Sequence, residues 1–172
     1  GPGGMIGYLG AGRKNGSVFR AETQMAVEAL QVNAGFVRAA LKEHPAFRNL
    51  MCDYRDALED WAAQALACRS YHRTEKRLAR WLHFAQTCTL SNRFDLTHSD
   101  LGDLLGVSRT VITEAIRRLE RLELISSSRS NIHILDRRGL RSAACKCRES
   151  HIRKNIILPS PGPDIELRIA SM

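Results

Sequence analysis

The stretch LTHSDLGDLLGVSRTVITEAIRRLERLELIS, residues 96–126, constrains the fold more than any other part of this chain. Thr97, with Asp100 three residues later, predicts the capped start of a short helix. Gly106 predicts a left-handed end to that helix, and Ser108 predicts the cap of a longer second helix. A short helix, a tight turn and a longer helix form a helix-turn-helix, a unit that places side chains against base edges in the DNA major groove.

Apolar spacing assigns one face of each predicted helix to a core, because the residues recur at intervals of three and four. The opposite face of the second helix is polar. A guanidinium at Arg109 can reach guanine O6 and N7 together, which is worth about 1–3 kcal/mol of discrimination between bases. The apolar positions are Leu101, Leu104, Leu105, Ile112, Ala115, Ile116 and Leu119, and the predicted base readers are Arg109, Thr110, Thr113 and Glu114.

A second set of polar residues is better placed for phosphate contacts, which position a protein on DNA without reading its sequence. The alternative is that all these residues are solvated side chains of an amphipathic helix. The predicted phosphate contacts are Thr97, His98, Ser108, Arg117 and Arg129.

The residues after the second helix predict a β-hairpin packed against the helices as a wing. Leu124, Ile125 and Ser126 begin an extended run, and SSSRSN at 126–131 has the composition of a turn. Residues 132–135 (IHIL) supply the returning strand. Arg129 lies at the predicted tip.

These motifs resemble the winged-helix DNA-binding domain of the Crp/Fnr family of bacterial transcription regulators. The likeness rests on the helix-turn-helix core, on the LE-x-x-x-LI end of the second helix, and on ILDRRGL followed by AC-x-C. In that family the Arg after the turn reads guanine, and Arg109 holds this position. The next family position is often Glu, whereas this chain has Thr110, so the usual half-site of the family is not transferred.

The resemblance extends upstream, more weakly. IGYLGAG, SVFRAET and AVEALQV resemble the last part of a cyclic-nucleotide-binding β-barrel, residues 45–70 resemble the dimer helix, and RLARWL resembles the following helix. A complete barrel would need about six more strands before Ile6, so the resemblance implies a truncated or degenerate regulator, or a fragment.

The predicted fold class is therefore mainly α with small β elements. A winged helix-turn-helix domain follows a long dimerisation helix and a partial cyclic-nucleotide-binding-type β-barrel remnant. The expected divisions are residues 1–43 for the barrel remnant, 44–72 for the long helix and hinge, 73–150 for the DNA-binding domain, and 151–172 for a C-terminal tail. Thr74 is a candidate cap for the first helix after the hinge.

The long helix is predicted from residues 45–70, which contain no Gly and have Pro only at the first position. Apolar residues recur there every three or four positions, as in a coiled coil. This stripe suits either a parallel homodimer or an ordinary buried helix, and the helix-turn-helix context favours the dimer. The predicted dimer residues are Leu50, Tyr54, Leu58, Trp61 and Ala65.

The charge of the chain fits a polyanionic partner. Its formal net charge is +8, and residues 117–154 hold eleven Lys and Arg against four Asp and Glu. No apolar run approaches the ~20 residues that cross a bilayer, and no signal peptide is visible. The five cysteines are an odd number, which together with the missing signal argues for free thiols in a reducing cytoplasm.

No cofactor, metal or catalytic centre is predicted. Tyr8 stands where a cyclic-nucleotide site of the family would have Glu, and the loop lacks an Arg-Ser or Arg-Thr pair, so a cyclic nucleotide is not expected and any other effector is unidentified. Cys145 and Cys147 lack a second close pair with the spacing of a zinc site. The chain also shows no nucleophile elbow, phosphate loop or His-Glu metal motif, which argues against an enzyme.

The predicted function is that of a sequence-specific transcription regulator that reads a palindromic site as a homodimer. The expected partners are double-stranded DNA and a second copy of the chain, with RNA polymerase as a further candidate, and no membrane is expected. The alternative is a ligand-sensing or protein-interaction module with vestigial DNA contacts, which the shortened barrel motivates.

Overall fold

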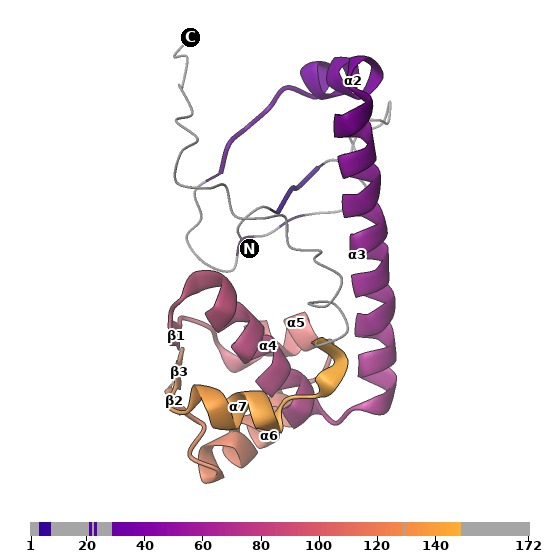
Figure 1. Ribbon diagram of the computed structural model, residues 1–172. Helices are drawn as coiled ribbons and strands as arrows, with labels where there is room; N and C mark the ends of the chain where they lie inside the picture. Colours follow the sequence, from indigo (N-terminus) through magenta and orange to yellow (C-terminus); the bar gives the residue numbers. More distant parts are fainter. Residues whose placement is uncertain (1–3, 8–20, 22, 24–28, 129, 149–172) are drawn as a thin grey trace.

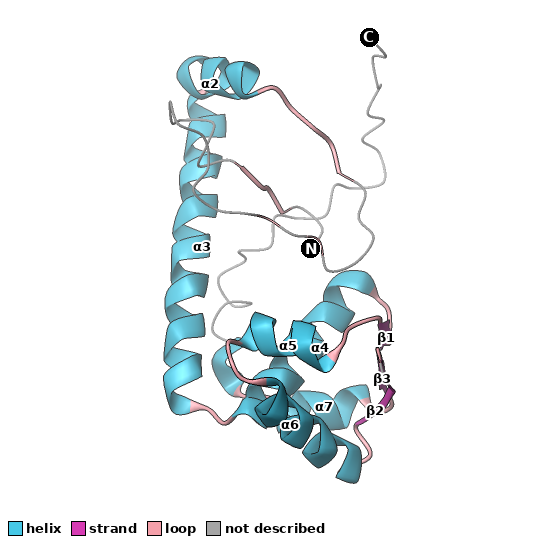
Figure 2. Cartoon of the chain, turned by 180° about the vertical axis from the view of Figure 1, so that it is seen from behind, coloured by secondary structure: helices cyan, strands magenta, loops and turns pink. Residues whose placement is uncertain are grey.

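The computed structural model describes residues 4–7, 21, 23, 29–128 and 130–148. Two helices, α2 (Ala34–Glu43) and α3 (Pro45–Tyr71), precede a compact group made of all the later elements (Figure 1). α3 stands along one side of the molecule, with α2 at one end and the compact group beside the other end (Figures 1 and 2).

The long helix forms as the sequence predicts and extends one residue further, to Tyr71. Pro45 occupies its first turn, where a missing N–H leaves no helical hydrogen bond unmade. At 1.5 Å per residue its 27 residues span about 40 Å. The first helix of the next domain, α4 (Thr74–Thr89), follows after two residues.

Three helices form the core of the domain: α4, α5 (His98–Leu105) and α6 (Arg109–Arg121). Their buried faces follow the predicted spacing, and full burial of each Leu or Ile contributes about 1.5–3 kcal/mol. The side chains with the least exposure in this core are Leu78, Leu82, Phe94, Leu101, Ile112, Ile116, Leu119, Ile125, Ile132 and Leu140.

The wing is a three-stranded antiparallel sheet in the order β1-β3-β2. β2 (Ile125–Ser128) and β3 (Asn131–Ile134) are the predicted hairpin, with Ile125 opposite Ile134. β1 (Arg93–Phe94) was not predicted and pairs with the other edge of β3. Phe94 is 1% exposed, so this short strand contributes a large side chain to the core.

Two elements close the described chain. α7 (Arg137–Ala143) begins at Asp136, whose carboxylate accepts a hydrogen bond from the Arg138 N–H, and it buries Leu140. A single 3-10 turn, η1 (Lys146–Arg148), follows it. In Figure 1 this end of the described chain, in yellow, lies beside the lower half of α3.

One expectation needs correction. Thr74 is the first residue of α4 and does not cap it; Arg73 is the N-cap and makes no side-chain capping bond. Residues 34–43, at the end of the range expected for the barrel remnant, form α2, and Asn33 caps this helix by accepting a hydrogen bond from the Gly35 N–H.

Other expectations lie outside the described residues. Most of residues 1–33 lies outside the described part of the chain, so the barrel remnant is not confirmed. The tail at 151–172 lies outside it as well. Arg129, the predicted phosphate contact at the tip of the wing, is also outside them. Within the described residues, no helix has both the length and the apolar character needed to cross a membrane.

Candidate nucleic-acid interface

The start of α5 is held by a complete capping box. Thr97 Oγ1 accepts from the Asp100 N–H at 3.2 Å, and Asp100 Oδ2 accepts from the Thr97 N–H at 2.8 Å. The Thr97 hydroxyl also donates to the same carboxylate oxygen at 2.8 Å. These bonds favour the ionised carboxylate, first through the backbone N–H and then through the hydroxyl, and they lower the pKa of Asp100 below its ordinary value.

The turn between α5 and α6 depends on two glycines. Gly106 ends α5 at φ +63°, in the left-handed region where a side chain is strained. A Cβ on Gly102 would lie 2.9 Å from the carbonyl oxygen of Val107, so α5 approaches the turn more closely than a larger residue allows. From α4, the buried guanidinium of Arg77 donates to the Leu105 carbonyl at the end of α5. This contact was not predicted from the sequence.

After the turn, α6 begins with exposed residues. Ser108 caps the helix, because its hydroxyl accepts from the Val111 N–H at 3.4 Å. Arg109 follows as the first helical residue and is exposed, and its guanidinium makes no hydrogen bond or ion pair to any described residue. A cation free of internal partners at this position is available to an external acceptor.

A hollow of about 650 Å³ opens where the starts of α5 and α6 meet β2 of the wing. Three of the residues that line it were predicted as DNA contacts from the sequence, and three serines were not. No sequence motif marks these serines as DNA contacts. Ser127 and Ser128 were assigned to the turn of the hairpin, whereas they belong to β2. The hollow is lined by Thr97, His98, Ser99, Arg109, Ser127 and Ser128.

One hydrogen bond connects the start of α5 directly to α6. His98 Nδ1 lies 3.0 Å from Thr113 Oγ1, and the Thr113 hydroxyl lies 2.9 Å from the Arg109 carbonyl oxygen. Since the only hydroxyl proton of Thr113 goes to that carbonyl, His98 must be the donor to Thr113, with its proton on Nδ1. Thr113 keeps one lone pair for an outside donor, so its predicted contact with a base is limited to accepting.

The remaining predicted contacts on α6 are surface residues. Thr110, Glu114 and Arg117 are exposed and have no side-chain hydrogen bond or ion pair to the described part of the chain. By contrast, Arg118 lies 3.2 Å from Glu75 of α4 and connects the two helices on another face. The polar residues of α6 thus divide into a group with contacts inside the chain, which includes Thr113, and a group without them, to which Thr110, Glu114 and Arg117 belong.

The wing is fixed to α6 by a carboxylate. Glu120 Oε1 accepts from the Ser127 N–H at 2.8 Å and from the Ser127 hydroxyl at 2.7 Å. On the β1 side of the sheet, the Asn131 side chain of β3 donates to Asp95 at 2.7 Å. The Glu120 contacts hold β2 beside α6, so the hollow has a defined wall.

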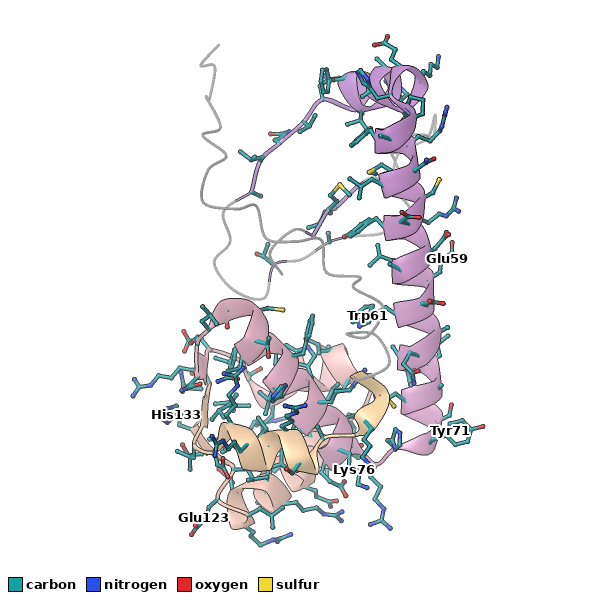
Figure 3. All side chains as sticks on the ribbon, viewed as in Figure 1. Glu59, Trp61, Tyr71, Lys76, Glu123 and His133 are labelled. Carbon is teal, nitrogen blue, oxygen red and sulfur yellow. The ribbon has the colours of Figure 1, made fainter. Side chains whose placement is uncertain are left out.

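The predicted dimer residues occupy one side of α3. Leu50 is 42% exposed and Trp61 50% exposed, whereas Leu58 and Ala65 are half-buried. Figure 3 shows Trp61 on the side of α3 that faces the rest of the chain, and Glu59 on the opposite side. The Tyr54 hydroxyl is engaged within its own chain: it accepts from the Met5 N–H at 2.8 Å and lies 3.1 Å from the Met5 carbonyl oxygen.

A three-helix core, a sheet packed beside its third helix, and an exposed start to that helix define a winged helix-turn-helix domain. The comparison with protein families agrees: residues 76–143 match the family described as the Crp-like helix-turn-helix domain. The chain therefore contains a Crp-like helix-turn-helix domain, and the resemblance to the Crp/Fnr family is confirmed for this part. No curated protein matches the chain.

Solved structures are similar to part of this chain. A Crp/Fnr-family structure from Eubacterium rectale is 23% identical, with a TM-score of 0.54. The alignment covers 64% of this chain and 51% of that one, so the chain spans about half the length of this neighbour. A Crp/Fnr-family transcriptional regulator from Thermus thermophilus is 17% identical, with a TM-score of 0.40, over 66% of this chain and 56% of that one.

Proposed function

We propose that this protein is a transcription regulator that binds double-stranded DNA and reads a palindromic site as a homodimer. The observation that carries the proposal is the state of Arg109. Its guanidinium is exposed at the first turn of α6, which is the recognition helix in this proposal. The guanidinium lines the hollow beside the wing and has no partner among the described residues. In a major groove, the guanidinium can donate two hydrogen bonds to O6 and N7 of a guanine.

The surroundings of Arg109 suit a phosphate backbone. The hollow combines hydroxyl groups and the His98 ring with the start of two helices, whose N–H groups favour anions. Ser127 and Ser128 of the wing extend the polar wall away from the helices. In this proposal α6 enters the groove, while the start of α5 and the wing contact the flanking phosphates.

The homodimer is proposed from α3. This helix carries exposed Leu50 and Trp61 on one stripe, and a second copy packed along that stripe would cover both. Two recognition helices related by the resulting two-fold axis would contact half-sites about one DNA turn, ~34 Å, apart. A palindromic site is the expected consequence of that symmetry.

DNA binding is tested by selecting bound fragments from a random duplex library with the full chain. We expect enrichment of a palindromic motif, and an affinity for it that falls steeply as salt rises, since the contacts displace counterions from phosphates. Enrichment of no motif, or an affinity that does not respond to salt, would contradict the proposal.

The dimer is tested by sedimentation velocity on the wild type and on Leu50→Glu, Trp61→Glu and Leu66→Glu variants. Leu66 is the matched control: it is 68% exposed on the same helix, but five residues after Trp61 and therefore about 140° around the axis. The first two variants should sediment as monomers and the control as a dimer. A monomeric wild type, or equal effects at all three positions, would exclude this dimer.

A further inference from the structure

Three cysteine side chains meet where the end of α3 contacts the end of the described chain. Cys68 comes from the last turn of α3, and Cys145 and Cys147 come from the segment after α7. Their sulfur atoms all lie within 4.8 Å of one another, with Cys68 Sγ 3.5 Å from Cys145 Sγ. Cys68 and Cys145 are buried, and Cys147 is half-buried.

The Cys145-x-Cys147 spacing alone does not predict a metal site. Cys68 is 77 residues away from Cys145 along the chain, so no sequence motif joins it to this pair. The fold supplies this third thiol because α3 runs beside the domain to which α7 belongs (Figure 1). The backbone joins the same two regions, since the Cys145 N–H donates to the Lys76 carbonyl oxygen of α4 at 3.4 Å.

The sulfur positions fit a small soft cation. A metal that binds thiolates at about 2.3 Å holds them about 3.8–4.0 Å apart, in tetrahedral or trigonal geometry. The separations within the cluster bracket this value, with 3.5 Å for one pair and an upper bound of 4.8 Å for all. The three sulfurs can therefore bind one ion with small side-chain adjustments and no movement of the helices.

The charges around the cluster suit three thiolates. Arg77 and Arg80 of α4 are close enough for their guanidinium groups to interact electrostatically with Cys68. Arg80 Nε is buried and has no hydrogen-bond acceptor among the described residues. Positive charge around the site would offset the net negative charge of a metal bound by three thiolates.

A metal ion competes with protons for these sulfur atoms. A bound cation would replace the thiol protons, because thiolates are the form that ligates metals.

We propose that Cys68, Cys145 and Cys147 form a binding site for one soft d10 cation, Zn²⁺ or Cu⁺. Thiolate ligands select these ions over hard cations such as Mg²⁺ and Ca²⁺. Cu⁺ is satisfied by three thiolates in a plane, whereas Zn²⁺ takes a fourth ligand such as water. The bound ion would connect the end of α3 to the DNA-binding domain and so restrict their relative orientation. This site is separate from the proposed DNA interface.

The experiment uses the full chain, reduced and freed of metal with a chelator, and titrated with Zn²⁺ or Cu⁺ against a chromophoric competitor. Co²⁺ serves as a spectroscopic substitute for Zn²⁺, because its thiolate charge-transfer band reports how many thiolates bind. We expect one equivalent bound, and at least a 10-fold loss of affinity in each of Cys68→Ser, Cys145→Ser and Cys147→Ser. Cys52→Ser and Cys88→Ser are the matched controls, since these cysteines lie outside the cluster, and both should bind as the wild type does.

Saturable binding by three thiolates would establish the site. The competition would show whether Zn²⁺ or Cu⁺ binds more tightly. The proposal would be overturned if binding persisted in a variant with Cys68, Cys145 and Cys147 all changed to Ser. It would also be overturned if binding were lost equally in the controls or were absent from the wild type. Circular dichroism of each variant verifies that the domain stays folded. The readout requires no DNA, so failure of the metal site and failure of the proposed DNA binding are distinguishable.

Discussion

His98 Nδ1 donates to Thr113 Oγ1 across 3.0 Å, and this contact joins the first residue of α5 to the exposed face of α6. The Thr113 hydroxyl in turn donates a hydrogen bond to the Arg109 carbonyl oxygen. The two helices of the unit are thus connected on their outer side by polar groups as well as on their inner side by the core. The position of Arg109 relative to α5 depends on both connections.

The first prediction concerns this connection. In a double-mutant cycle with His98→Ala and Thr113→Val, we expect a coupling of about 0.5–1.5 kcal/mol in the free energy of unfolding, the usual net value of one hydrogen bond. Urea unfolding followed by circular dichroism measures it. His98→Ala with Thr110→Val is the control cycle, because Thr110 is exposed on the same helix without a partner among the described residues. Additive effects in both cycles would show that the contact contributes nothing.

The second prediction concerns base reading. Arg109→Ala should reduce the preference for the selected DNA site over random DNA by about 5- to 150-fold, which corresponds to the 1–3 kcal/mol of a bidentate contact. Arg109→Lys should restore overall affinity more than preference, because an ammonium lacks the planar fork of a guanidinium. Fluorescence anisotropy with both duplexes at one salt concentration gives the ratio.

Arg48→Ala is the matched control for this measurement. It removes the same charge from the exposed surface of α3, in the half that lies away from the DNA-binding domain (Figure 1). Its preference ratio should equal that of the wild type. An unchanged ratio in Arg109→Ala would remove this residue from the base-reading surface and leave it a phosphate contact at most.

Much of the domain could be predicted because its determinants are local. The caps at Thr97 and Ser108, the end of α5 at Gly106 and the buried spacing of α6 are all set within a few residues of sequence. Hairpin β2–β3 followed from a polar turn between two apolar runs. Each of these is confirmed, because short-range geometry and the core favour the same conformation.

The unpredicted features depend on residues that are far apart in sequence. β1 is only two residues long, and it is a strand because Phe94 enters the core and β3 offers a free edge. Arg77 reads as a polar position of an amphipathic helix, yet it is buried because it caps Leu105 of another helix. The meeting of Cys68 with Cys145 likewise requires the packing of α3 against the domain, which no local pattern encodes.

The third prediction concerns the pH dependence of stability. The pKa of Asp100 is lower in the folded chain than its ordinary value of 3.8, because Thr97 donates two hydrogen bonds to the carboxylate. The carboxylate therefore stabilises the fold above that ordinary value, and the contribution is lost as the pH falls through the lowered pKa. Asp100→Asn should be less stable than the wild type near neutral pH, and the difference should shrink in acid.

Thermal unfolding of both proteins between about pH 7 and pH 2.5 measures this difference over the window set by the lowered pKa. Asp103→Asn is the control, since Asp103 is exposed on the same short helix and takes no part in the capping box. A stability gap for Asp100→Asn that stays constant across the range would contradict the assignment.

The fourth prediction uses two exposed leucines that both end helices. Leu90 ends α4 at φ +57° and is 86% exposed, whereas Leu122 ends α6 at φ −89° and is 62% exposed. A left-handed conformation costs a non-glycine residue about 1–2 kcal/mol, so Leu90→Gly relieves strain and loses little burial. Leu122→Gly relieves nothing and adds about 0.5–1 kcal/mol of backbone entropy to the cost of folding.

We therefore expect different effects on the free energy of unfolding from the same substitution at two similar positions. Leu90→Gly should leave the free energy of unfolding unchanged or raise it by up to about 1 kcal/mol, after the entropy of glycine is subtracted from the relieved strain. Leu122→Gly should lower it. Urea titration of the two variants beside the wild type measures both free energies of unfolding. If both substitutions destabilise the protein equally, the backbone at Leu90 is not strained, and the left-handed end of α4 has no measurable effect on the stability of this domain.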